Sequence, residues 1–249
     1  MDAFRGQLEH IPIPTTSFQG QTIIVTGSNT GLGLEAARHF VRLDADIVIL
    51  AVRSLERGEA AKASIEASTK RKNVVQVWQL EMDKYDSIKS FASRCNTLER
   101  LDVVVENAGI LRNTYEESEG TEITIKVNVI GTFLLALNLF PILRRSYEKT
   151  RRVPRLVITS SAVHYNGLPR YLLSIAKTLV ARKTEEGSRT LVHSAAAGDE
   201  SHGKYMSECR VREPSNFVRS KAGAETQARV HKELMAILES IQPGITQNI

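Results

Sequence analysis

Apolar residues along the chain fall into short continuous runs, separated by stretches in which they recur with a helical period. The runs Thr22–Val25 and Ile47–Val52 are rich in β-branched residues and are continuous rather than alternating, which is typical of strands buried on both faces. Between them, Ala36, Ala37 and Phe40 share one face of a helix. The pattern predicts five strands, at Thr22–Val25, Ile47–Val52, Val74–Leu80, Leu101–Val105 and Arg155–Thr159.

Helices alternate with these strands. The helical period predicts them at Leu34–Leu43, Leu55–Ala67, Tyr85–Arg94, Thr121–Leu143 and Glu225–Leu238. Repeated strand–helix units with continuous apolar strands imply a parallel sheet covered on both faces, and the right-handed crossover rule makes it doubly wound. We therefore predict an α/β fold, a Rossmann-type doubly wound parallel sheet, in a single domain over residues 1–249. Residues 166–215 are predicted as an irregular insertion near the substrate site.

Composition and charge narrow the class of protein. The 249 residues are 42% hydrophobic and 24% charged, which excludes a disordered chain or a small disulfide scaffold. The net charge of +5 is spread without a long basic stripe, so we expect no nucleic-acid partner. Cys95 and Cys209 form no C-x-x-C pair, which favours a reducing, cytoplasmic setting. The first twenty residues lack the apolar core of a signal peptide, and Val127–Leu143 is short for a span, so we expect a buried helix and no membrane partner.

A glycine-rich turn follows the first strand. Residues 26–33 read T-G-S-N-T-G-L-G and lead directly into a helix. Glycines allow a tight turn and let backbone N–H groups approach a pyrophosphate, and the helix N-terminus adds a favourable dipole. A glycine triplet alone is weak evidence, but its place between a buried strand and a helix favours nucleotide binding. The candidate cofactor-binding residues are Gly27, Ser28, Asn29, Thr30, Gly31, Leu32 and Gly33.

Four further motifs follow in order along the chain. They are Glu106-Asn107-Ala108-Gly109 after the fourth strand, Val127-Asn128-Val129-Ile130-Gly131 in a helix, Ser160-Ser161 after the fifth strand, and Pro243-Gly244 near the end. Together with the T-G-x-x-x-G-x-G turn, they make the chain resemble the short-chain dehydrogenase/reductase family over about residues 18–248. Residues 18–67 and 101–110 look most like fungal members, which often serve secondary metabolism.

The resemblance implies a nicotinamide dinucleotide cofactor, held by the glycine turn together with Asn107, Ala108, Gly109, Pro243 and Gly244. An acidic residue after the second strand would favour NAD(H). Arg53 stands there instead and can pair with a 2′-phosphate, which favours NADP(H), although a solvated loop arginine is the alternative. Where the family has an adenine-binding aspartate, this chain has Glu81, and the backbone of Met82 or the side chain of Asp83 can serve the same purpose. For Asp83, capping of the next helix is an equally good interpretation.

The resemblance also implies a catalytic set. It comprises a tyrosine that transfers the hydroxyl proton, a lysine four residues later that binds the nicotinamide ribose, a serine that orients the substrate oxygen, and an asparagine in a water relay. Lys221, Ser161 and Asn128 take the last three places. Phe217 occupies the tyrosine position, and a phenylalanine cannot act as a general acid or base. A second Y-x-x-x-K sequence begins at Tyr85 on another helix, and we interpret it as a surface helix turn.

Three explanations for Phe217 stay open. Another group carries out the proton transfer, the fold serves binding or a non-redox reaction, or the residue is a laboratory change made to trap a complex. Candidates for the substitute group are Ser161, His164, Tyr165 and Tyr205.

The C-terminal end is short for the family. Ile237–Gln242 is predicted as a shortened sixth strand, and we expect neither the substrate lid nor the seventh strand of the family to follow it. Our leading hypothesis is an NADP(H)-dependent oxidoreductase that transfers hydride to or from a carbonyl or alcohol of a small organic molecule in secondary metabolism, with altered or impaired proton transfer. The alternatives are a cofactor-binding pseudoenzyme and a non-redox cyclase or isomerase. The resemblance allows a homo-oligomer through the long helices.

Overall fold

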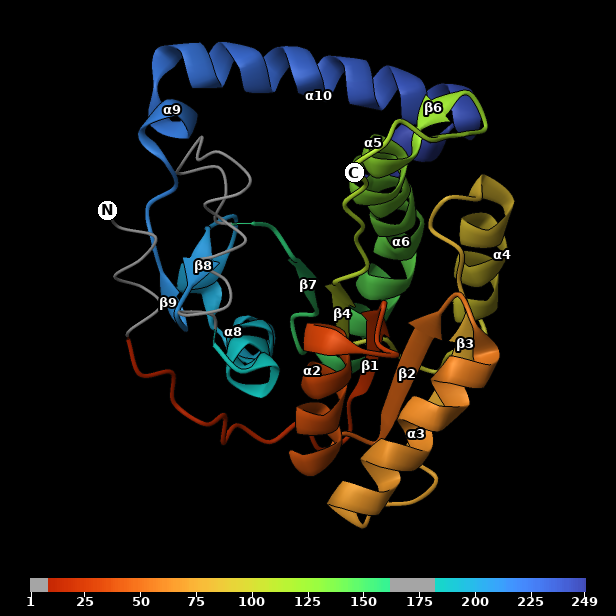
Figure 1. Cartoon of the computed structure of the whole chain (residues 1–249), viewed down its shortest axis with the longest axis vertical. Helices are drawn as coiled ribbons and strands as arrows, with labels where there is room; N and C mark the ends of the chain where they lie inside the picture. The colour runs from red at the N-terminus through yellow and green to blue at the C-terminus, as the bar shows by residue number, and fades with distance from the viewer. Residues whose placement is uncertain (1–8, 162–181) are drawn as a thin grey trace.

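The computed structural model describes residues 9–161 and 182–249. Its centre is a parallel sheet of five strands in the order β3-β2-β1-β4-β7 (Figure 1). The strands are β1 Thr22–Thr26, β2 Ile47–Val52, β3 Val75–Gln79, β4 Val103–Glu106 and β7 Arg155–Ile158. The strand order reverses between β1 and β4, which creates the crevice where such sheets bind ligands. The predicted doubly wound α/β sheet is confirmed.

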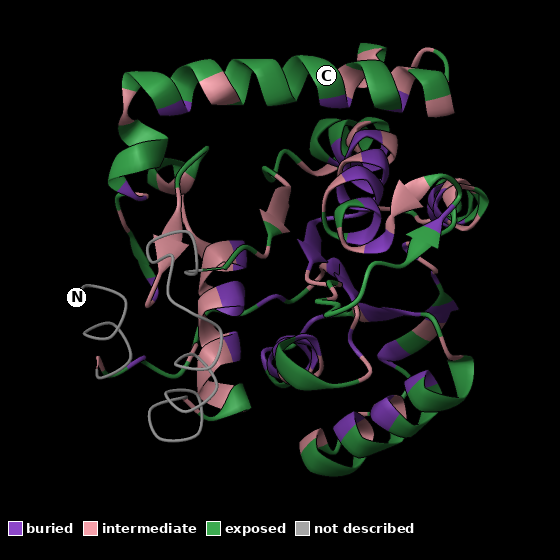
Figure 2. Cartoon of the chain, turned by 45° about the horizontal axis from the view of Figure 1, so that its top comes forward, coloured by how far each residue is buried: buried purple, intermediate pink, exposed green. Residues whose placement is uncertain are grey.

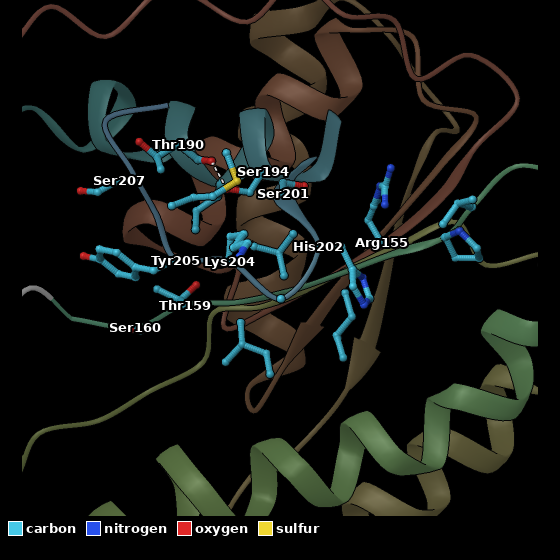
Figure 3. A pocket seen from close by; sticks show the side chains of 18 of the residues that line it. Arg155, Thr159, Ser160, Thr190, Ser194, Ser201, His202, Lys204, Tyr205 and Ser207 are labelled. Carbon is cyan, nitrogen blue, oxygen red and sulfur yellow. Dashed lines mark hydrogen bonds between the residues drawn. The ribbon is translucent and has the colours of Figure 1, made fainter. Parts of the chain in front are cut away.

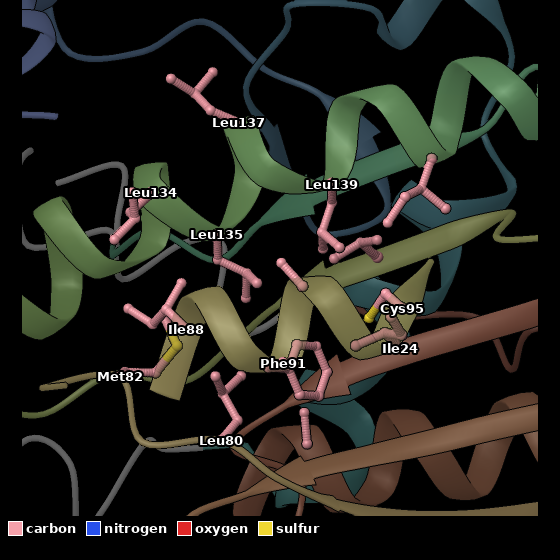
Figure 4. Close-up of a cluster of buried hydrophobic side chains, with 14 of the residues drawn as sticks. Ile24, Leu80, Met82, Ile88, Phe91, Cys95, Leu134, Leu135, Leu137 and Leu139 are labelled. Carbon is pink, nitrogen blue, oxygen red and sulfur yellow. The ribbon is translucent and has the colours of Figure 1, made fainter. Parts of the chain in front are cut away.

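Helices cover both faces of the sheet and build two apolar cores. The first core takes side chains from α2 (Gly31–Arg42), α3 (Leu55–Thr69) and α8 (Thr184–Ala196), and the second from α4 (Tyr85–Cys95) and α6 (Thr132–Thr150). Successive strand residues alternate between them: Ile23 and Val105 enter the first core, whereas Ile24 and Val104 enter the second. Figure 4 shows the second core, with α4 and α6 side chains packed over Ile24. The strands are apolar at nearly every position because both of their faces are buried.

The helix predicted over Thr121–Leu143 is interrupted. A short hairpin of β5 (Glu117–Ser118) and β6 (Thr121–Glu122) leads into α5 (Ile123–Ile125), the π-helical turn η1 (Lys126–Gly131) and then α6. A Cβ on Gly131 would lie 2.5 Å from the carbonyl oxygen of Met82, so this crossing requires glycine. The helical run Ile123–Thr150 is long and apolar enough to cross a membrane, and 61% of its most apolar window is buried inside the protein.

The region after β7 contains more regular structure than predicted. In the described part of residues 166–215, α8 is followed by a 3₁₀ turn and a two-stranded hairpin, and the chain then continues through two α-helices to a last 3₁₀ turn. These elements are η3 (Asp199–Ser201), β8 (Met206–Ser207), β9 (Arg210–Val211), α9 (Asn216–Arg219), α10 (Lys221–Ile241) and η4 (Ile245–Asn248). Residues 166–181 of the predicted insertion lie outside the described residues.

The prediction of a shortened sixth strand at Ile237–Gln242 is wrong, because α10 continues through Ile241. Leu234 and Leu238 lie one helical turn apart and are both buried, so the apolar positions follow a helical period. The remainder of α10 is largely exposed along one end of the molecule (Figure 2). Within the described residues the sheet therefore ends at β7, whose outer edge has no strand neighbour.

Candidate functional site

The glycine turn has the backbone conformation that its sequence requires. Gly27 and Gly31 have φ angles of +64° and +65°, in the left-handed region that favours glycine. A Cβ on Gly33 would lie 2.5 Å from Asn107 Nδ2, so the third glycine lets the turn close against the loop after β4. The turn opens α2, whose first turn holds no acidic residue and whose N-cap, Thr30, makes no side-chain capping bond. The first N–H groups of a helix have no intrahelical partner, so this helix end can bind an anion.

Thr26, the last residue of β1, holds the turn and the β4 loop together. Its Oγ1 accepts hydrogen bonds from the backbone N–H groups of Asn107 at 3.0 Å and Ala108 at 2.9 Å. Asn107 Nδ2 in turn donates to the Thr26 carbonyl at 3.0 Å, and Ser28 Oγ donates to the Val25 carbonyl at 2.7 Å. Asn107 and Ser28, predicted as cofactor ligands, thus use these groups to brace the turn itself. The sequence analysis did not single out Thr26, although a hydroxyl directly before the first glycine was the available signal.

Asn128 lies in the π-helical turn and braces the same loop from the other side. Its Oδ1 accepts from the Ile110 N–H at 2.9 Å, and its Nδ2 donates to the Ile110 carbonyl at 2.7 Å. A Cβ on Gly109 would lie 3.3 Å from Asn128 Oδ1, so the two segments pack closely. The structure brings Asn107, Ala108, Gly109 and Asn128 together beside the glycine turn, and a role for Asn128 in a water relay stays a prediction.

The second and third strands end in residues that suit the adenosine half of a dinucleotide. Arg53 follows β2 directly, is exposed, and has no hydrogen-bond or ion-pair partner among the described residues. Ser54 beside it caps α3 by accepting from the Arg57 N–H at 3.3 Å. After β3, the Glu81 carboxylate accepts from the Gln79 amide at 3.2 Å, and Met82 is buried. No acidic side chain follows β2 at the place where one would repel a 2′-phosphate.

A cavity of about 1220 Å³ runs along the outer edge of β7. Leu32 of the glycine turn lines it, so the cavity adjoins the predicted cofactor site. Figure 3 shows Thr159, Ser160 and Tyr205 toward one end of the cavity and Arg155 toward the other. Its volume exceeds the roughly 300–1,000 Å³ of ordinary ligand pockets, which leaves room for a substrate beside the cofactor. The sequence analysis missed this cavity, because its walls come from separate elements brought together only by the fold.

The structure does not gather the predicted catalytic residues. Phe217 lies on α9 with 59% of its surface exposed, and the Lys221 side chain at the start of α10 is 92% exposed, with Nζ 4.0 Å from Glu225 Oε1. Neither residue lines the cavity, whereas Ser160, the neighbour of exposed Ser161, does. The expectation that Phe217 and Lys221 stand over the cofactor site therefore finds no support in this fold. The physical reason is that residues 216–241 form an arm of exposed helix rather than a layer packed on the sheet.

Other proton-transfer candidates are unevenly placed. Tyr205 lines the cavity and is half-buried, and burial, its largest influence, raises the pKa of its hydroxyl above the ordinary value of 10.0. His164 and Tyr165 lie outside the described residues.

Pro243 and Gly244 follow a helix rather than a strand. Gly244 has φ of +85° and its N–H donates to the Glu239 carboxylate, so the turn closes the end of α10. The adjoining η4 packs on α6, where Asn248 Nδ2 donates to the Leu137 carbonyl at 3.0 Å. The predicted cofactor contact of Pro243 and Gly244 assumed a preceding strand, and that assumption is wrong.

The Y-x-x-x-K sequence that begins at Tyr85 has a structural role. It occupies the first turns of α4, as interpreted. The ammonium group of Lys126 lies 4.1 Å from the centre of the Tyr85 ring, and Lys89 Nζ donates to the Ile241 carbonyl at 3.0 Å. Both side chains therefore hold other elements in place.

Glu106, the last residue of β4, is a buried acid. It is 3% exposed, and its two carboxylate oxygens have no hydrogen-bond partner within the described part of the chain. Burial raises the pKa of Glu106 well above its ordinary value, because a buried carboxylate loses its hydration. Nothing in the sequence around Glu106 distinguishes it from an ordinary motif residue, because its burial depends on the packing of distant segments.

Comparisons with known proteins agree with the fold and the motifs. The short chain dehydrogenase family pattern matches residues 21–186. The chain is 37% identical to the short chain dehydrogenase/reductase dmxR8 of Cryptosporiopsis sp., with 96% of each chain covered, and 38% identical to the short chain dehydrogenase atnD of Emericella nidulans, with 82% of this chain and 88% of that one covered. A crystal structure of a putative short chain dehydrogenase from Escherichia coli CFT073 complexed with NADPH is 28% identical, with a TM-score of 0.53, and covers 72% of this chain and 70% of that one.

The match to dmxR8 runs over 312 positions, which exceeds the 249 residues of this chain. That relative therefore carries residues within the match that have no counterpart here. The glycine turn, the loop after β4 and the strand order agree with these matches. The chain belongs to the short-chain dehydrogenase family.

Proposed function

We propose that this protein binds NADP(H) at the glycine turn and acts as an oxidoreductase that transfers hydride to or from a carbonyl or alcohol of a small organic molecule. The observation that carries the proposal is the turn itself. Gly27 and Gly31 have positive φ angles, Gly33 packs against Asn107, and the turn is braced by Thr26 and Asn107 and opens a helix without an acidic first turn. Such a turn directs free backbone N–H groups toward a bound pyrophosphate, which accepts hydrogen bonds from them.

The residues at this edge of the sheet fit such a cofactor. The turn between Gly27 and Gly33 would hold the pyrophosphate, Arg53 the 2′-phosphate, and Glu81 or the Met82 backbone the adenine. The loop from Asn107 to Gly109 would lie under the ribose on the nicotinamide side. When bound, the cofactor supplies or accepts the hydride, and the cavity beside β7 would hold the second reactant.

The proton step is where this chain departs from its family. Phe217 has no hydroxyl group, and Lys221 is solvated beside Glu225. A positioned acid contributes about 10²- to 10⁴-fold in rate, so a chain without one turns over slowly. Several hydroxyl groups line the cavity, and among them Tyr205 and Ser160 lie with Thr159 toward the end of β7 (Figure 3). We propose that Tyr205 or Ser160 supplies the proton.

The missing tyrosine hydroxyl and the exposed position of Lys221 also favour a second candidate function. Because the cofactor half of the site is assembled while Phe217 and Lys221 stay outside it, a cofactor-binding protein without turnover is the alternative. It predicts the same affinity for NADPH and no consumption of it.

Calorimetry and a turnover assay separate the two functions. We expect NADPH to bind more tightly than NADH, and Arg53→Ala to weaken NADPH binding about 10- to 100-fold while leaving NADH unchanged, because a charge-assisted contact to the 2′-phosphate is lost. Lys62→Ala on α3 is the matched control and should bind both cofactors as the parent protein does.

NADPH consumption is then followed over a panel of aldehydes and ketones. Turnover that falls in Tyr205→Phe supports the oxidoreductase, and NADPH binding without turnover supports the alternative. Absence of NADPH binding to the parent protein rejects both.

The setting of this reaction is also a proposal. The matched relatives come from fungi such as Cryptosporiopsis and Emericella, which supports a role in fungal secondary metabolism. We propose a cytoplasmic protein whose partner is a small-molecule substrate rather than nucleic acid or membrane. Sedimentation at several concentrations would test whether it forms a homo-oligomer.

A further inference from the structure

The polarity of the cavity beside β7 changes along its length, and this change indicates the chemistry of its ligand. One face of α6 lines it at helical spacing, with Phe140, Leu143 and Tyr147 pointing inward, and Leu191 of α8 lies on the opposite wall. The side chains of Leu156 and Ile158 on β7 also line it, and Ile158 is 40% exposed. The middle of the cavity is therefore apolar and suits a hydrocarbon body.

Basic side chains gather toward the end where β7 begins. Arg144 and Arg151 come from the same α6 face and its C-terminus. Lys204, from the segment after η3, also lines the cavity but lies nearer Tyr205 and Thr159 (Figure 3). The side chains of Arg144, Arg151 and Lys204 have no hydrogen-bond or ion-pair partner among the described residues. Arg155, at the start of β7, pairs with exposed Asp199, with Nη2 3.3 Å from Oδ1.

Acidic side chains do not balance these cations. Among the described residues that line the cavity, the carboxylates are Glu148 and Glu208. Glu208 forms ion pairs with two arginines: its Oε1 lies 3.7 Å from Arg182 Nη1 and its Oε2 lies 3.8 Å from Arg212 Nε. Its negative charge is therefore already neutralised. Glu148 alone faces the unpaired cations, which leaves a net positive charge at this end.

We propose that the cavity binds an amphipathic anion: an apolar molecule that carries a carboxylate or phosphate group at the Arg151 end. The proposal rests on the proposed function for one point: the reacting carbon lies at the other end of the cavity, beside Thr159 and Ser160. From Arg155 to Ser160 an extended chain spans about 16 Å. The acidic group therefore lies about that far from the carbon that exchanges hydride.

Titration calorimetry on the full chain without cofactor tests the proposal, with decanoate, 1-decanol and decyl phosphate as probes. We expect decanoate to bind at least tenfold more tightly than 1-decanol. The double variant Arg144→Gln/Arg151→Gln should weaken decanoate binding about tenfold and leave 1-decanol unchanged, because only the charged contacts are lost. Decyl phosphate that binds more tightly than decanoate assigns the natural ligand to phosphate esters, and the reverse order assigns it to free acids.

Arg145→Gln is the matched control. It lies on the same helix, but its Nη2 donates to the Asn96 carbonyl at 3.3 Å and the residue does not line the cavity. Equal binding of decanoate and 1-decanol, or an equal loss in Arg145→Gln, overturns the proposal. NADPH titration of the same variants keeps the two hypotheses apart, since the anion proposal predicts unchanged NADPH affinity in Arg144→Gln/Arg151→Gln.

Discussion

At the scale of single residues, the cofactor end of the molecule depends on a few buried polar groups. The Thr26 hydroxyl accepts hydrogen bonds from two backbone N–H groups of the loop after β4, and the Asn107 side chain donates one to the Thr26 carbonyl. Glu106, one residue earlier, has no such partner and stays in the core as an acid without hydration. The first arrangement stabilises the turn, whereas the second makes folding sensitive to pH.

Replacing Thr26 by alanine should destabilise the fold and loosen the turn. The change leaves the Asn107 and Ala108 N–H groups without an acceptor, at a cost of about 1–3 kcal/mol for each group that stays buried. Urea unfolding measures the loss, and NADPH affinity should fall with it. Thr26→Ser keeps the hydroxyl and should recover most of both quantities, and a Ser variant as poor as the Ala variant would contradict the role assigned to Oγ1.

Replacing Glu106 by glutamine should change how stability depends on pH. Burial raises the folded-state pKa above the unfolded value, so the native state holds a proton that the unfolded state releases. The contribution of Glu106 to stability is therefore full below the ordinary pKa of 4.5 and is lost as the pH rises through the folded pKa. The slope of that loss is about 1.4 kcal/mol per pH unit.

Urea melts between pH 4 and pH 9 measure this effect. Glu106→Gln should gain stability relative to the parent protein as the pH rises, while Glu59→Gln on the exposed side of α3 should track the parent throughout. A Glu106→Gln difference that is flat across the range would show that the carboxyl group finds a partner in solution.

At the scale of elements, α10 is attached to the molecule mainly at its C-terminal end. Leu234 and Leu238 are buried there, and Lys89 of α4 donates to the Ile241 carbonyl, the last residue of the helix. A cation at a helix C-terminus satisfies an otherwise unpaired carbonyl and matches the helix dipole. The N-terminal half of α10 is exposed except for buried Gly223 and half-buried Thr226.

Replacing Lys89 by methionine should therefore release α10 without unfolding the sheet. We expect a loss of about 1.5 kcal/mol, the low end for a hydrogen bond from a charged donor, because the Lys89 side chain is partly exposed. Hydrogen exchange should quicken in residues 234–241 and stay slow in β1 and β4. Lys232→Met, an exposed lysine on α10 itself, is the control, and faster exchange across the whole sheet would disprove the local attachment.

At the scale of the whole molecule, the segment before β1 ties distant parts together. Residues 9–18 run past α2 and α8 (Figure 1). Arg189 of α8 donates to the Ile11 carbonyl at 2.6 Å, and Arg42 of α2 donates to the Pro14 carbonyl at 2.8 Å. Ile11 and Phe18 are buried at the two ends of this crossing. The segment thus holds α8, one wall of the cavity, against the sheet.

Replacing Arg189 by glutamine should free the N-terminal segment. The Ile11 carbonyl loses a charged donor, which contributes about 1.5–3 kcal/mol, so the segment should open roughly tenfold or more often. Limited proteolysis within residues 9–18 measures that opening. Arg229→Gln, on the exposed face of α10, should leave the cleavage rate unchanged, and an unchanged rate in Arg189→Gln would show that Ile11 and Phe18 suffice.

Much of the sheet and of the cofactor end could be predicted because local rules decide them. Continuous β-branched runs located β1, β2 and β7 to within a residue or so, and the glycine spacing located the turn that opens α2. The predictions for the C-terminal part depended instead on short motifs of two to five residues. The Phe217 to Lys221 spacing occurs on exposed helical segments, and the dipeptide Pro243-Gly244 occurs in the turn after α10. Nothing in either motif says which surface it approaches.

By itself the sequence determined the fold class, the strand positions, the glycine turn and the family. These follow from side-chain period and backbone freedom, which act over a few residues. Only the tertiary structure decided that Thr26 and Asn128 brace the turn, that Glu106 is a buried acid, that Phe217 and Lys221 lie outside, and that α6, α8 and β7 enclose one cavity with cations at one end. Those properties depend on which distant segments pack together, and packing is a matter of long-range contacts that no local pattern records.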